Sequence, residues 1–136
     1  MSRNVGALAS RRIVSVGENQ TLADAARRMN EQRVGSAIVL IEGSMPGIIT
    51  ERDLLRSIAD GADPSTALVG DYMTPIAITA SANWDLQEAA QRMFDGGFRH
   101  LIVLDEQGSP AGILSMRDVA KALLEIATED RPTSIT

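Results

Sequence analysis

Two short segments of the chain carry the residue types best suited to hold a small polar ligand. Residues 47–53 read Gly-Ile-Ile-Thr-Glu-Arg-Asp, and 65 positions later residues 112–118 read Gly-Ile-Leu-Ser-Met-Arg-Asp. Each segment places a hydroxyl residue three positions before a carboxylate, which predicts the start of a helix. That end of a helix presents unpaired N–H groups and partial positive charge, so it can hold an anion while the side chains bond to hydroxyls. The two pairs are Thr50 with Asp53 and Ser115 with Asp118.

The same segments also have a purely structural explanation, because residues of these types at this spacing cap helices without any ligand. Thr21 and Asp24 show the same spacing with no other sign of a site. Capping does not explain why a glycine and two apolar residues precede both boxes, nor why an arginine stands before each aspartate, Arg52 and Arg117. These arginines are candidate phosphate contacts, with solvated helix charges or salt bridges of a dimer as the alternatives.

Strand-length apolar runs and helix starts recur in the same order in both halves of the chain. Strands are expected at residues 13–16, 36–41 and 47–49, and again at 76–79, 101–104 and from 112. Capping boxes predict helices from Thr21 and Asp85. Further helices are expected to begin at the two candidate ligand-binding segments, residues 47–53 and 112–118. The residues expected to face the core are Leu22, Ala25, Ala26, Met29, Leu54, Leu55, Ile58, Leu86, Ala89, Ala90, Met93, Val119, Ala122, Leu123 and Ile126.

Each half therefore reads β-α-β-β-α and is too short to cover both faces of its own sheet. We expect an α/β (α+β) fold of two such repeats, packed sheet to sheet about a pseudo-twofold axis with two ligand clefts between them. The expected boundaries are residues 5–61 for the first repeat, 62–68 for a linker, 69–128 for the second repeat and 129–136 for a flexible tail.

Composition narrows the functional classes. The formal net charge of −5 argues against a general nucleic-acid surface, so an anionic ligand would have to meet a local arginine cluster. No cysteine and a single histidine, His100, leave no plausible zinc or iron–sulfur ligand set, and we expect no metal. The sequence lacks a long apolar span and a signal-peptide pattern, which predicts a cytoplasmic protein without a membrane partner.

The repeated Gly-x-x-Ser/Thr-x-x-Asp segments and the repeated element order resemble a tandem CBS-domain pair, also called a Bateman module. The resemblance implies that Thr50 with Asp53 and Ser115 with Asp118 bind the ribose of an adenosine-containing ligand. It further implies that phosphate is met by Arg52, Arg99, His100 and Arg117. Backbone contacts to the base are expected from Ile13, Val14, Ser36, Ala37, Ile76, Ala77 and Ile78.

By this resemblance the chain is a regulatory sensor that requires no cofactor. Its ligand would be AMP, ADP, ATP or, by family precedent, S-adenosylmethionine or NAD, and binding would shift its conformation. We expect a homodimer that acts on an unknown effector protein in trans. The alternative is a ligand-free dimerisation and protein-interaction module. An enzyme is not expected, because no nucleophile stands beside a base near the motifs.

Overall fold

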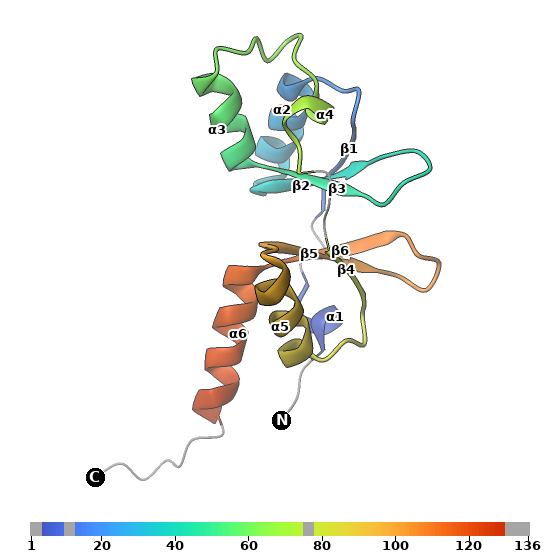
Figure 1. Ribbon diagram of the computed structural model, residues 1–136, viewed down its shortest axis with the longest axis vertical. Helices are drawn as coiled ribbons and strands as arrows, with labels where there is room; N and C mark the ends of the chain where they lie inside the picture. The colour runs from blue at the N-terminus through green and yellow to red at the C-terminus, as the bar shows by residue number, and fades with distance from the viewer. Residues whose placement is uncertain (1–3, 10–12, 75–77, 130–136) are drawn as a thin grey trace, which may run out of the picture. The chain divides into compact units, whose positions relative to one another are not determined.

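Two compact units form in the computed structural model, which describes residues 4–9, 13–74 and 78–129. One unit is built from residues 13–74, and the other joins residues 4–9 to residues 78–129. Each unit holds one three-stranded sheet with helices against one of its faces (Figure 1).

The first unit orders its strands β1-β2-β3. β1 (Ser15–Gly17) runs parallel to β2 (Ser36–Leu40), which pairs antiparallel with β3 (Gly47–Thr50). The parallel connection requires a crossover, and α2 (Leu22–Gln32) supplies it. α3 (Glu51–Ala59) follows β3 directly, and the short α4 (Val69–Tyr72) completes the unit.

The second unit repeats this arrangement with sheet order β4-β5-β6. β4 (Ile78–Ser81) is parallel to β5 (His100–Leu104), and β6 (Pro110–Ser115) is antiparallel to β5. α5 (Leu86–Gly96) makes the crossover, and α6 (Met116–Glu129) follows β6. The described strands form two separate three-stranded sheets, so the predicted β-α-β-β-α repeat is confirmed. Sheet-to-sheet packing of the repeats stays a prediction.

The two short helices are exchanged between the sequence repeats. α1 (Val5–Leu8) is the first helix of the first repeat in the chain but packs in the second unit, where the Gly6 N–H donates to the Ala82 carbonyl at 2.9 Å. A Cβ at Gly6 would lie 2.6 Å from the Ala82 Cβ, so only glycine fits this approach. α4 correspondingly packs in the first unit, where the Gly70 N–H donates to the Glu18 carbonyl at 2.8 Å. The repeated order of elements in the sequence did not predict this placement.

Apolar side chains between sheet and helices form one core in each unit. The first core contains Val14, Val16, Leu22, Ala25, Met29, Ala37, Val39, Ile49 and Val69. The second contains Val5, Ala9, Ala80, Leu86, Ala89, Met93, Leu101, Val103, Leu114, Val119 and Ala122. The other predicted core residues are partly buried, with two exceptions.

Leu55 and Ile58 are those exceptions, because 65% and 68% of their surfaces are exposed. The prediction that they point inward was wrong. α3 is amphipathic with a different inner face: Asp53 and Ser57 are buried, and Leu54 packs against the core. Since three residues along a helix return to nearly the same side, Leu55 and Ile58 share an outer face.

Several element boundaries also differ from the sequence predictions. β1 begins at Ser15, two residues later than expected, where its pairing with β2 begins. β4 is described from Ile78, and the two preceding residues of the expected strand, Ile76 and Ala77, lie outside the described residues. α6 includes Glu129, which was assigned to the flexible tail; the rest of that tail lies outside the described residues.

The caps of the crossover helices are also simpler than predicted. Thr21 accepts from the Asp24 N–H, but the Asp24 carboxylate bonds to Arg27 instead of completing a box. The hydrogen bond from Arg27 to this carboxylate lowers the pKa of Asp24. At the start of α5, Asp85 caps the N–H groups of Gln87 and Glu88.

A prediction about stability follows from the C-terminal ends of α2 and α5. Arg33 ends α2 in the left-handed region at φ 55°, where a side chain costs conformational energy. Its repeat counterpart, Gly97, ends α5 at φ 71° without that cost. Arg33→Gly should therefore raise the free energy of unfolding by about 0.5–1 kcal/mol in urea denaturation. Gly97→Ala is the matched control and should lower it by a similar amount, whereas a loss of stability in Arg33→Gly would contradict the argument.

Candidate functional site

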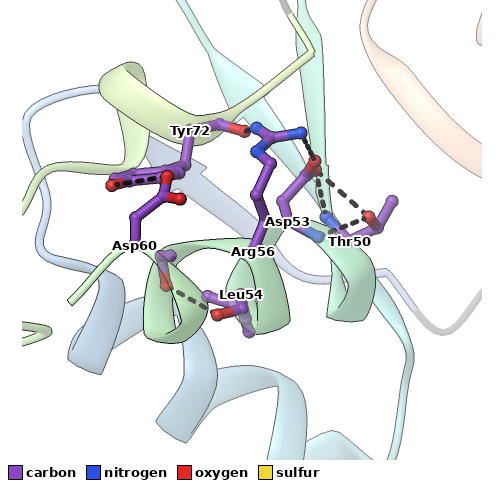
Figure 2. A network of polar contacts seen from close by, with 7 residues as sticks. Thr50, Asp53, Leu54, Arg56, Asp60 and Tyr72 are labelled. Carbon is purple, nitrogen blue, oxygen red and sulfur yellow. Dashed lines mark hydrogen bonds and ion pairs between the residues drawn. The ribbon is translucent and has the colours of Figure 1, made fainter. Parts of the chain in front are cut away.

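The first hydroxyl–carboxylate pair forms a complete capping box at the start of α3 (Figure 2). The Thr50 hydroxyl oxygen accepts a hydrogen bond from the Asp53 N–H at 3.3 Å. In return, Asp53 Oδ2 accepts from the Thr50 N–H at 2.9 Å and from the Thr50 hydroxyl at 3.1 Å. One of the two carboxylate oxygens is thus committed to the cap, and Asp53 as a whole is only 5% exposed.

The second pair forms the same reciprocal contacts at the start of α6. Ser115 Oγ accepts from the Asp118 N–H at 3.1 Å, and Asp118 Oδ2 accepts from the Ser115 N–H at 3.3 Å. Unlike its counterpart, Asp118 is exposed. Both helix starts predicted from the sequence are therefore present, but the two carboxylates differ in their access to solvent.

The antiparallel strand pairs bring the entrance of each central strand beside the hydroxyl residue of the same unit. Ser36 at the start of β2 lies opposite Thr50. His100 at the start of β5 lies opposite Ser115. The strand register therefore places two candidate residues that are 15 positions apart, His100 and Ser115, side by side.

The residue before each central strand is tied to the first turn of the following helix. The Glu51 N–H donates to the Gly35 carbonyl at 3.0 Å in the first unit. The Met116 N–H donates to the Arg99 carbonyl at 2.7 Å in the second. These bonds hold exposed Arg99 close to the start of α6, so the second unit combines an arginine, a histidine and an accessible carboxylate at one helix N-terminus. Such a set can accept from ligand hydroxyls and attract phosphate.

Comparison with known proteins identifies the repeated unit. The family model of the CBS domain matches residues 5–60 and again residues 69–125. The chain belongs to the CBS-domain family. A 17.7 kDa protein of Acidianus ambivalens is 34% identical over 129 residues, which cover 94% of this chain and 77% of that protein. A Methanopyrus kandleri relative is 33% identical, and the match covers 87% of this chain but 61% of that protein.

Solved structures of CBS-domain proteins share the architecture. A CBS domain protein from Pyrobaculum aerophilum, complexed with AMP, is 29% identical with a TM-score of 0.75; the match covers 92% of this chain and 98% of that one. The cytosolic domain of the Mg²⁺ channel MgtE, in complex with ATP, is 28% identical with a TM-score of 0.69, covering 88% of this chain and 48% of that one. The tandem CBS pair predicted from the sequence is confirmed.

In the first CBS repeat, the other carboxylate oxygen of Asp53 is also occupied. Arg56 Nη1 lies 3.4 Å from Asp53 Oδ1, and Arg56 Nη2 donates to the Tyr72 carbonyl at 2.9 Å. The Arg56 guanidinium carbon lies 5.7 Å from the centre of the Tyr72 ring, and the Tyr72 hydroxyl is 3.5 Å from Asp60 Oδ2. Figure 2 shows Arg56 between Asp53 on its own helix and Tyr72 on α4.

Neither Arg56 nor Tyr72 was a candidate from the sequence. The contact of Arg56 with Asp53 could have been predicted from the sequence, because opposite charges three residues apart on a helix lie on one face. No sequence pattern predicts the contact with Tyr72, since Tyr72 reaches Arg56 only when α4 packs beside α3. This contact links the candidate ribose residue to the last helix of its unit.

The remaining candidate residues lie in different environments. Arg52 and Arg117 are exposed on the first turns of α3 and α6. Val14 and Ala37 are core residues, and the Val14 carbonyl already accepts from the Ile38 N–H at 2.8 Å. The other expected base contacts are Ile13 and Ile78, which are half-buried, and Ile76 and Ala77, which lie outside the described residues.

One open groove is not lined by the residues of the hydroxyl–carboxylate pairs. It measures about 1190 Å³ between α5 and α6, and its lining includes Phe94, Leu123 and Ile126 but neither Ser115 nor Asp118. Within residues 4–9, 13–74 and 78–129, no three His, Cys, Asp or Glu side chains gather in a way that suits a metal ion. None of the helices described has the length and apolar character needed to cross a membrane.

Proposed function

We propose that this CBS pair is a regulatory module that binds an adenosine-containing ligand, such as AMP, ADP or ATP, at its hydroxyl–carboxylate helix starts. The observation that carries the proposal is the start of α6, where exposed Asp118 is fixed by Ser115 close to Arg99 and His100. The carboxylate would accept hydrogen bonds from two ribose hydroxyls, and the helix N-terminus and arginine would attract phosphate. The AMP complex of the Pyrobaculum relative supports this choice of ligand.

Regulation requires that the ligand bind one conformation of the protein more tightly than another. A ligand shifts an equilibrium only by its difference in affinity for the two states. The signal in this proposal is therefore a change in conformational population, read by an effector protein. The proposal includes no catalytic step and no cofactor beyond the regulatory nucleotide.

A thermal-shift panel tests the proposal directly. Adenosine, AMP, ADP, ATP and S-adenosylmethionine are each tested for a rise in the melting temperature. A ligand at a hundred times its Kd stabilises the folded state by about 2.7 kcal/mol, so at equal concentration the compounds that bind more tightly should raise the melting temperature more. Guanosine and GMP serve as controls, since they share the ribose but not the base. No shift with any adenosine compound would favour the alternative, a ligand-free interaction module.

We also propose that two copies of the chain associate through their helices. α5 and α6 expose Phe94 and Leu124 on 77% and 69% of their surfaces, and the groove between the two helices is largely apolar. α3 adds the exposed pair Leu55 and Ile58. Apolar helix faces of this kind are favoured in contacts between protein chains. A second copy offers the same faces, which allows a twofold-symmetric contact.

A further inference from the structure

We infer that Arg56 is an internal competitor that controls the ligand site of the first CBS repeat and connects its occupancy to α4. This inference rests on the proposed function and adds regulation to one of its two sites. It assigns Arg56 a positioning role, because Arg56 acts through the carboxylate of Asp53.

Competition follows from how the two oxygens of Asp53 are used. Oδ2 accepts two hydrogen bonds from Thr50, and Oδ1 pairs with the Arg56 guanidinium at 3.4 Å. The Asp53 side chain is 8% exposed, whereas that of Arg56 is 55% exposed. Asp53 is therefore almost closed to solvent while its partner remains accessible. Ligand hydroxyls that require Oδ1 must displace Arg56 or share the oxygen with it.

The described residues of the second repeat lack an ion pair between the site carboxylate and the cationic residue three positions later. The residue at the position of Arg56 is Lys121, which follows Asp118 by three residues, as Arg56 follows Asp53. Both Lys121 and Asp118 are exposed, and the ion pairs in the described part of the chain include none between them. Two sites with the same hydroxyl–carboxylate pair thus differ in whether a cation occupies the carboxylate. We expect the ligand to fill the second site first.

Arg56 also provides a mechanical connection. Its Nη2 holds the carbonyl of Tyr72, the last residue of α4. Two residues later, Thr74 exchanges hydrogen bonds of 2.8 and 3.0 Å with Ile48 in β3, after which the chain passes to the second unit. A ligand that displaces Arg56 from Asp53 would therefore disturb the Tyr72 contact beside this connection. Occupancy of the first site would be transmitted to α4 by one side chain.

Affinity measurements test the competition. Asp118→Asn serves as the background because it weakens the second site, and adenosine is the probe because it has no phosphate for Arg56 to attract. Adding Arg56→Gln should tighten adenosine binding by about two- to fivefold in isothermal titration. Arg56→Lys keeps the charge but lacks the planar guanidinium that reaches both Asp53 and Tyr72. Its adenosine affinity should therefore lie between that of the Asp118→Asn background and that of the background with Arg56→Gln. Unchanged or weaker binding in Arg56→Gln would overturn the inference.

The matched control uses the other repeat. Lys121→Gln in an Asp53→Asn background should leave adenosine affinity unchanged, because Lys121 does not pair with Asp118. An equal gain in both backgrounds would indicate a general effect of removing positive charge and would overturn the specific role of Arg56.

Tyr72 supplies a structural readout, because it is the only tyrosine in the chain. With ¹³C-labelled tyrosine, Arg56→Gln should shift the ring signals in the absence of ligand, and adenosine added to Asp118→Asn should move them in the same direction. If adenosine binds but the Tyr72 signals do not move, and if Arg56→Gln leaves the adenosine affinity unchanged, this inference is overturned and the proposed function still stands. If none of these proteins, wild type included, binds adenosine or AMP, the proposed function fails, and the control over its site fails with it.

Discussion

Asp118→Asn should weaken AMP binding at the second repeat by roughly ten- to a hundredfold. Asparagine keeps an oxygen that can cap the helix, but it loses the negative charge that strengthens hydrogen bonds from ribose hydroxyls. Each such charge-assisted bond is worth about 1.5–3 kcal/mol. The melting temperature without ligand should change little, because the side-chain oxygen of asparagine can still accept from the Ser115 N–H. Isothermal titration with AMP and ATP measures the first effect, and thermal denaturation measures the second.

Asp53→Asn is the matched variant in the first repeat. It should weaken binding at the first site by the same roughly ten- to a hundredfold while leaving the second site at wild-type affinity. A role in capping alone predicts the reverse pattern: nucleotide affinity would be unchanged in both variants, and any loss would be confined to stability. That result would contradict the ribose assignment for both repeats.

Phe94→Glu should convert the proposed dimer into a monomer if the groove between α5 and α6 is the contact between two copies. A carboxylate buried in an apolar interface loses its hydration, and removal of a central aromatic residue typically costs about 2 kcal/mol or more, equal to about thirtyfold in affinity. Light scattering at micromolar concentration should give twice the 14.5 kDa of one chain for the wild type and a single chain for the variant.

The fold itself should tolerate this change, because Phe94 is 77% exposed in one chain. Gln107→Glu, in the exposed turn between β5 and β6, adds the same charge away from the groove and should leave the dimer intact. A wild-type protein with the mass of one chain would rule out the stable dimer. If the dimer persists in Phe94→Glu, the contact between the two copies lies on another surface, and the outer face of α3 is the next candidate.

The local features of the site could be predicted from the sequence because they depend on residues close together in the chain. Thr50 and Asp53 meet within one turn of helix, as do Ser115 and Asp118, and their reciprocal hydrogen bonds need no distant partner. The same spacing at Thr21 and Asp24 produced only one of the two bonds, since Arg27 competes for the carboxylate. Residue types at a given spacing therefore predict the helix start better than the final bonding of each side chain.

The sequence by itself determined the β-α-β-β-α repeat, the apolar runs of its sheets and the two hydroxyl–carboxylate pairs, since periodicity and capping act over a few residues. Only the tertiary structure decided that α1 packs in the second unit, that Leu55 and Ile58 face outward, and that Asp53 is buried beneath Arg56 while Asp118 is exposed. The contact of Arg56 with Tyr72, 16 residues away, depends on how α4 packs beside α3. Burial and pairing at that range are set by which elements meet in space, and local patterns of spacing and capping do not reveal which elements those are.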